Sequence, residues 1–237
     1  RHLLDLMNAP RRPGESRSLV VNNSWGMFHP SWDFPVGHPG NYSDNPNHPF
    51  SRIVATLERA GADILFAAGN CGADCPDGRC QGVTDRPIYG ANSSTSVLCV
   101  AGVDTTKERV GYSSNGPGRL ENRKPDISGF THFKGSGVYT ADGGTSAACP
   151  VVSGVVAAIR SALAMGAHRG ILVKTDQQFL DSTTTAQALK AAIAADGSPD
   201  IIFAGKTSVD TEGFQTLYRL AAALDLPVAS EVVDFKL

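Results

Sequence analysis

The sequence predicts an α/β protein built on parallel strands, followed by a second, partial α/β unit. Short apolar runs alternate with segments of helical spacing in the front part of the chain. A long helix of small apolar residues follows near the middle. Behind it, strands and helices alternate in the order β-α-β-α-β, which is typical of a parallel sheet with crossover helices.

The composition is that of a folded globular chain. Its 237 residues are 41% hydrophobic and 19% charged, which excludes a disordered chain, a collagen and a coiled coil. A formal net charge of −2 gives no signature of nucleic-acid or anionic-membrane binding. The sequence contains no run of about 18 apolar residues, so we expect no transmembrane helix. The chain starts at Arg1 rather than Met, so we expect a processed, trimmed or partial chain, and its localisation stays unknown.

The front part is expected to form one domain over residues 1–160. Residues 27–50 hold five prolines and are expected to form a long surface loop. Pro150 is tolerated because it falls in the first turn of its helix. Strands are predicted at Leu19–Asn22, Asp63–Ala68 and Val97–Val103, and helices at Ser51–Ala60 and Ala147–Leu163.

A second unit is expected over residues 161–237, because the pattern changes after about residue 164. Strands are predicted at Ile171–Lys174, Asp200–Ala204 and Val228–Val233, and helices at Thr183–Ala195 and Thr211–Leu224.

Five cysteines are present, and three of them, Cys71, Cys75 and Cys80, cluster in a loop rich in Gly, Asp and Pro. The spacing is not that of a common zinc site, and no histidine follows closely. A loop disulfide is therefore favoured over free thiols and over metal ligands, and no metal site is predicted. Cys99 and Cys149 complete the odd count.

Residues Gly143–Pro150 open a helix with a serine at its start. A nucleophile there gains from the helix dipole and from unpaired N–H groups, and an oxyanion on an attacked carbonyl would face the Ser146 N–H. The glycines permit close approach of a substrate backbone. The alternative is that Thr145 or Ser146 only caps the helix.

Three motifs follow one another along the front part of the chain: Val21-Asn22-Asn23-Ser24-Trp25-Gly26, Phe66-Ala67-Ala68-Gly69-Asn70 and Gly144-Thr145-Ser146-Ala147-Ala148-Cys149-Pro150. Further segments of note lie at Val100–Asp104, Tyr112–Pro117 and Lys124–Ile127. By these motifs and their order, about residues 1–160 resemble the subtilisin-like serine proteases. The resemblance implies a three-layer parallel-sheet fold, with the family's N-terminal strands missing, and hydrolysis of a peptide or protein substrate without a cofactor.

Residue roles follow from the same resemblance. Ser146 matches the nucleophile, and Asn70 matches the amide that stabilises the oxyanion, a donor whose loss in subtilisin lowers turnover by about 10²–10³. Trp25 departs from the commoner leucine and either narrows the specificity pocket or simply packs. The walls of that pocket are matched by Ser24, Trp25, Gly26, Ala67, Ala68 and Gly69.

A catalytic serine needs a base, and in subtilisins the aspartate and the histidine precede the serine in chain order. The residues before Ser24 contain neither an Asp-Ser/Thr-Gly nor a His-Gly-Thr-His motif. We therefore expect a partner segment upstream to supply both, and an inactive protease in this chain alone. His2 and Asp5 have the wrong surroundings for these roles. A substitute base is not expected among the other histidines either: three precede a proline in the long loop, and one lies in a strand-like segment (His29, His38 and His48; His132).

A second candidate site follows the predicted strand at Asp200–Ala204. A strand, a glycine loop and a helix start make a natural anion site, because unpaired N–H groups and the helix dipole point at the loop. The spacing is neither GxGxxG nor a P-loop, so an ordinary turn with a solvated Lys206 is the alternative.

Three stretches of the rear part carry a second resemblance: Ala162–Ile171, Pro199–Lys206 and Leu226–Ser230. Through them, about residues 158–237 resemble the electron transfer flavoprotein beta subunit. The resemblance implies an AMP-binding loop, with FAD in a partner. The residues matched to that loop are Gly205, Lys206, Asp210, Gln215 and Thr216, whereas Thr207, Thr211, Glu212 and Phe214 depart from the pattern.

Three functions are consistent with these features. The first is a serine endopeptidase of subtilisin type that is inactive as this chain alone. The second is a nucleotide-binding module of electron transfer flavoprotein beta type. The third is a fusion of two fragments without activity.

Overall fold

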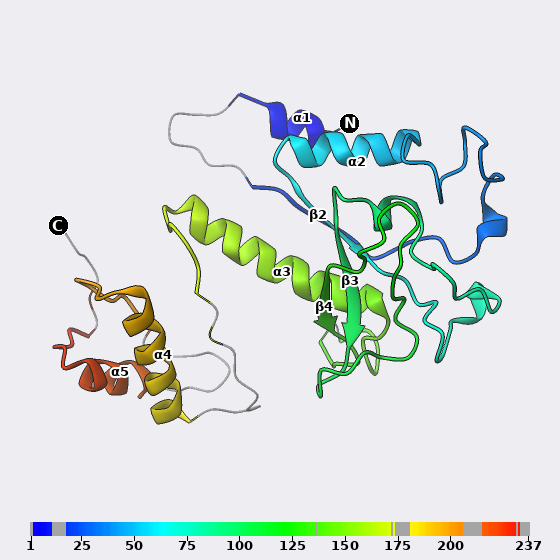
Figure 1. Cartoon of the computed structure of the whole chain (residues 1–237). Coiled ribbons are helices and arrows are strands. Elements are labelled where there is room, and N and C mark those ends of the chain that lie inside the picture. Colours follow the sequence, from blue (N-terminus) through cyan, green and yellow to red (C-terminus); the bar gives the residue numbers. More distant parts are fainter. Residues whose placement is uncertain are drawn as a thin grey trace. The chain divides into compact units, whose positions relative to one another are not determined.

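The computed structural model describes residues 2–10, 18–135, 137–171, 173, 181–205, 215–230 and 232 (Figure 1). The chain divides into two compact units, Arg1–His168 and Arg169–Leu237.

The first unit is built on a parallel sheet in the order β1-β2-β3-β4. Its strands are β1 (Val20–Asn23), β2 (Asp63–Ala67), β3 (Leu98–Val103) and β4 (Ile127–Phe130). The predicted parallel α/β fold is therefore confirmed. Three strands lie where the apolar runs predicted them, whereas β4 was missed because Ser128 and Gly129 interrupt its apolar pattern.

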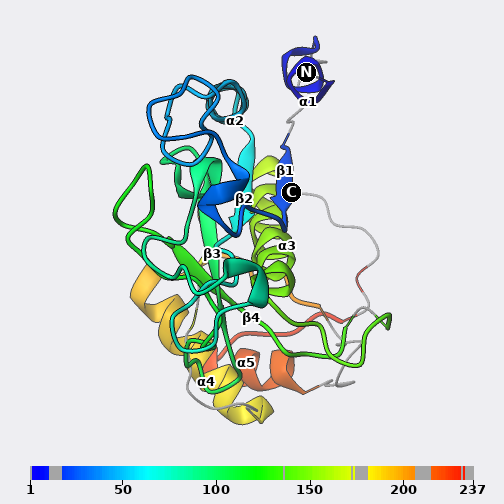
Figure 2. The same cartoon turned by 90° about the vertical axis from the view of Figure 1, so that its right-hand side faces the viewer.

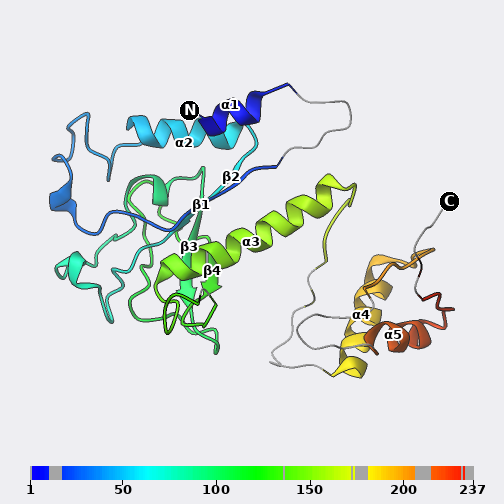
Figure 3. The same ribbon diagram turned by 180° about the vertical axis from the view of Figure 1, so that it is seen from behind.

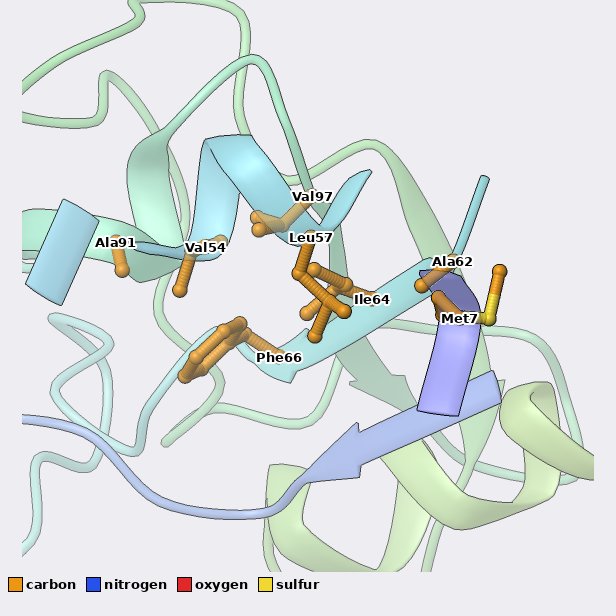
Figure 4. Packing of buried hydrophobic residues seen from close by; sticks show 8 residues of the cluster. All are labelled: Met7, Val54, Leu57, Ala62, Ile64, Phe66, Ala91 and Val97. Atoms are coloured by element: carbon orange, nitrogen blue, oxygen red, sulfur yellow. The ribbon is translucent and has the colours of Figure 1, made fainter. Parts of the chain in front are cut away.

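Helices cover both faces of this sheet and give three layers (Figure 2). On one face, α2 (Pro49–Arg59) packs on β2, and α1 (His2–Asn8) contacts α2. The buried side chains of this layer include Val54, Leu57 and Phe66, which point toward one another (Figure 4). Helix α1 was not predicted.

The opposite face is covered by α3 (Thr145–Ala164), which crosses all four strands (Figure 3). Its first turns are buried through Ala148, Cys149 and Val152, packed on Leu65 and Val100. Its later turns expose apolar side chains, namely Val155, Ile159 and Leu163. By length and composition this helix could cross a membrane, a property that the core helices of soluble proteins share.

The cysteine cluster contains a disulfide between Cys71 and Cys80, as the loop spacing favoured. Cys75 is a free, exposed thiol, and Cys99 and Cys149 are free and buried. No group of metal-ligating side chains occurs within the described ranges. The bridge closes a loop that begins directly after Asn70, so it anchors the chain next to a candidate site residue.

In the second unit, the described residues form α4 (Ser182–Asp196), which packs against α5 (Thr216–Leu224). The predicted strand at Asp200–Ala204 is not formed: residues 201–205 are irregular, and Ile201 and Phe203 are exposed. A strand exists only when a neighbour pairs with its backbone, and no other strand lies in the described part of this unit. The strands predicted at 171–174 and 228–233 fall partly outside the described residues, and their described positions are also irregular.

Candidate functional site

Ser146 lies in the first turn of α3, exposed between the buried Thr145 and Ala147. Its Oγ donates a hydrogen bond to the backbone carbonyl of Ser24 at 3.0 Å. A carbonyl oxygen can accept this bond but cannot take the proton away, so the hydroxyl is positioned without being activated.

Asn70 is oriented by Thr145, the residue before Ser146. Its Oδ1 accepts hydrogen bonds from the Thr145 N–H at 3.0 Å and from the Thr145 hydroxyl at 2.9 Å. The Gly69 N–H in turn donates to Thr145 Oγ1 at 3.1 Å. Because Oδ1 is occupied in this way, the amide Nδ2 of Asn70 is turned toward Gly144.

Gly144 lies beside two nitrogen atoms that carry N–H groups. A methyl group placed on Gly144 would lie 3.2 Å from Asn70 Nδ2 and 3.6 Å from the Ser146 nitrogen. Residue 144 has no side chain to crowd these two groups, and it adopts φ +79°, a conformation that favours glycine. Neighbouring N–H donors of this kind are what stabilisation of an oxyanion requires.

Gly144 is held by two hydrogen bonds that the sequence did not predict, here called the Gly144 clamp. The Gly144 N–H donates to the Tyr112 hydroxyl at 2.8 Å, and the Thr131 hydroxyl donates to the Gly144 carbonyl at 3.0 Å. The Tyr112 hydroxyl also lies 3.0 Å from His132 Nε2. Tyr112 belongs to one of the protease-like segments, but only the fold brings it and Thr131 to this turn.

The two predicted pocket walls are joined by a buried asparagine. Asn92 Nδ2 donates to the carbonyls of Trp25 and Ala67, both at 2.9 Å. Gly26 lies so close to this amide that an added methyl group would come within 2.8 Å of it. The structure thus brings Ser24–Gly26 and Ala67–Gly69 to one place, and only a glycosylation-type motif marks Asn92 in the sequence.

The Trp25 side chain is half exposed and packs on two other aromatic rings. Its ring centroid lies 5.5 Å from Phe50 and 5.2 Å from Phe66. This packing holds the indole in place beside the predicted pocket wall at Ser24–Gly26.

A general base for Ser146 is absent from the described residues. His29 and His48 accept hydrogen bonds at the starts of helices, and His38 stacks on Phe34. His132 is engaged with Tyr112. No histidine or carboxylate hydrogen-bonds Ser146 in this part of the chain; its hydroxyl is bonded to the Ser24 carbonyl instead.

Cys149, one turn after Ser146, is no competing nucleophile. Burial raises the pKa of the Cys149 thiol to about 11, which keeps it protonated at neutral pH.

The second set of predicted site residues is only partly covered. Gly205 is exposed, and Lys206 and Asp210 lie outside the described residues. Gln215 and Thr216 stand at the start of α5. Gln215 does not cap this helix; its Oε1 accepts from the Arg219 guanidinium at 2.6 Å, and Arg219 also donates to Thr183 of α4 at 2.6 Å.

Comparison with known proteins shows that the rear of the chain is similar to one protein family. Residues 140–237 match the Electron transfer flavoprotein domain family. The Electron transfer flavoprotein subunit beta of Syntrophomonas wolfei is 49% identical over 70 residues, covering 30% of this chain and 27% of that protein. Protein FixA of Rhizobium meliloti is 43% identical over 75 residues, covering 29% and 25%. The chain thus spans about a quarter of these relatives.

A second, weaker likeness is to proteases. Subtilisin DY of Bacillus licheniformis is 35% identical over 102 residues, covering 43% of this chain and 34% of that protein. Among solved structures, S41 Psychrophilic Protease aligns with a TM-score of 0.43 at 22% identity, covering 63% of this chain and 45% of that one. Sphericase aligns with a TM-score of 0.42 at 20% identity, covering 64% and 44%.

Proposed function

We propose that residues 169–237 contribute a nucleotide-binding segment of electron transfer flavoprotein beta type, with AMP as the ligand. The proposal is supported by sequence similarity. The chain is 43–49% identical over its matched residues to four relatives, two of them electron transfer flavoprotein beta subunits and two FixA proteins. Its partner would be the other subunit of such a flavoprotein, and FAD held with that partner would carry the electrons.

The described residues at the start of α5 fit a phosphate group. The helix dipole places partial positive charge there, and the Arg219 guanidinium adds a full charge one turn away. Because Oε1 of Gln215 is held by Arg219, the amide nitrogen of Gln215 is left to donate to a ligand. Residues 206–214, which would complete the loop, lie outside the described part.

Calorimetric titration of the full chain with AMP tests this proposal. We expect binding with a dissociation constant below about 1 mM, weakened about tenfold in Gln215→Ala through loss of one hydrogen bond to a charged group. The matched control is Gln187→Ala, an exposed glutamine on α4. Absence of binding up to about 1 mM would reject a nucleotide site in this chain.

The geometry around Ser146 favours a second candidate function for residues 1–168, acyl transfer by a serine nucleophile of subtilisin type. Attack of Ser146 Oγ on a peptide carbonyl would place the oxyanion between Asn70 Nδ2 and the Ser146 N–H. The start of the twenty-residue helix α3 adds its dipole to this stabilisation. A segment outside this sequence would supply the aspartate and the histidine; the outer edge of β1, at the end of the sheet order, is where another strand could pair.

Labelling with a fluorophosphonate probe tests this candidate, with imidazole in solution as a substitute base. We expect slow labelling of Ser146 that imidazole accelerates. Asn70→Asp keeps the acceptor that holds Thr145 but loses the donor, so labelling should fall by about 10²–10³.

Two serines of α3 separate specific from general labelling. Ser146→Ala should abolish the label, and Ser161→Ala, an exposed serine further along the helix, should leave it unchanged. Labelling that survives in Ser146→Ala would refute the assignment. Failure of both this test and the AMP titration would leave a fusion without activity.

A further inference from the structure

A cavity of about 430 Å³ lies between α2 and the loop before β3, and none of the functions above uses it. Its wall combines two arginines with several hydroxyl groups and contains no carboxylate. The polar residues of this wall that matter here are Ser51, Arg52, Thr56, Arg59, Ser94 and Ser96.

The positive charge comes from one stripe of α2. Arg52, Thr56 and Arg59 are spaced by four and three residues and so share a face, opposite to the core residues Val54 and Leu57 seen in Figure 4. The Thr56 hydroxyl donates to the Arg52 carbonyl at 2.8 Å and accepts from Arg59 Nη2 at 3.3 Å. Neither guanidinium forms an ion pair with a carboxylate of the described chain, so both charges are available to a ligand.

One hydroxyl of the wall is buried without a partner. Ser51 is 4% exposed, and its Oγ has no hydrogen-bond partner within the described structure. Leaving a buried hydroxyl unpaired costs free energy, which a hydrogen bond to a ligand in the adjoining cavity would recover. Across the cavity, Ser94 Oγ accepts from the Ser96 N–H at 3.2 Å and keeps its own proton to donate.

The geometry points to a binding site for a phosphate group in this cavity, either free phosphate or a small phosphomonoester. A phosphate carries up to two negative charges and several acceptor oxygens, which match the two guanidiniums and the hydroxyl donors of Ser51 and Ser94. The volume falls in the range of small-molecule sites and exceeds the need of a bare ion. This site is independent of the AMP site at α5 and of the Ser146 site.

Titration of the full chain with inorganic phosphate and, separately, with phenyl phosphate tests the assignment. We expect saturable binding of both probes, weakened about tenfold or more in the double variant Arg52→Gln/Arg59→Gln. Lys134→Gln, which removes one charge from a distant loop of the same unit, is the control and should bind as the parent does. Tighter binding of phenyl phosphate assigns the site to a phosphomonoester, and equal or weaker binding assigns it to free phosphate.

A second variant separates binding from folding. Ser51→Ala removes the unpaired hydroxyl, so the free protein should melt at the same or a higher temperature while phosphate binds several-fold more weakly. Gln187→Ala, at an exposed position of α4, should leave phosphate binding at this cavity unchanged. Absence of saturable binding in the parent, or equal affinity in the parent and the double arginine variant, would overturn the proposal.

Discussion

At the scale of single residues, Thr145 determines the arrangement around Ser146. It is 1% exposed, and it contacts Asn70 through both its backbone and its hydroxyl. Its hydroxyl also accepts from the Gly69 N–H, so one side chain holds both Gly69 and Asn70. The sequence offers Thr145 only as one possible helix cap, because nothing local shows that its partner lies 75 residues away.

Tyr42, also a single residue, leads to a prediction of how stability depends on pH. Burial raises the pKa of Tyr42 to about 12, and its hydroxyl accepts from the Ala91 N–H and donates to Asn92 Oδ1. Between the ordinary tyrosine pKa of about 10 and this value, the unfolded chain ionises while the folded one does not. The stability that Tyr42 contributes is thus complete below pH 10 and is lost as the pH rises toward 12.

Tyr42→Phe should therefore flatten the fall of the unfolding free energy between pH 8 and pH 11, measured by urea denaturation. It should also cost about 1 kcal/mol at pH 8 through the lost hydrogen bonds. Tyr218→Phe, at a half-exposed position of α5, is the control. An unchanged pH dependence in Tyr42→Phe would contradict this account.

At the scale of elements, the contact between β4 and α3 depends on a glycine. A methyl group on Gly129 would lie 2.6 Å from the Ala148 carbonyl oxygen and 2.9 Å from Val152 Cγ2. The helix can approach the strand this closely only because residue 129 has no side chain. The same glycine weakens the strand pattern in the sequence, which is why β4 was missed.

Gly129→Ala should destabilise the first unit by about 1–3 kcal/mol, because helix and strand must separate to admit the methyl group. Ser128→Ala, at the exposed neighbouring position, is the matched control and should change stability little. Urea denaturation followed by circular dichroism measures both. Equal stability of Gly129→Ala and the parent would show that α3 does not approach β4 so closely.

At the scale of the whole molecule, the five cysteines report on folding. Cys75 is exposed, whereas Cys99 and Cys149 are buried, and burial raises the pKa of both buried thiols. Cys71 and Cys80 are joined. The thiols therefore differ in accessibility and in chemical state.

Iodoacetamide at neutral pH should label Cys75 alone in the folded chain, as read by mass spectrometry of peptides. Urea without reductant should add Cys99 and Cys149, and urea with reductant should add Cys71 and Cys80. Rapid labelling of Cys149 in the folded chain would contradict the packing of α3 on the sheet. Labelling of Cys71 without reductant would contradict the disulfide.

The sequence by itself determined the parallel α/β class, three of the four strands and the place of α3, because apolar periodicity is a local property. It also singled out Ser146 and Asn70 through a resemblance. Only the tertiary structure decided the Cys71–Cys80 pairing, the clamp of Tyr112 and Thr131 on Gly144, and the irregular chain at 200–204. The physical reason is that the hydrogen bonds on Gly144 and the pairing of strands join residues that are far apart in sequence. No local sequence pattern predicts such contacts.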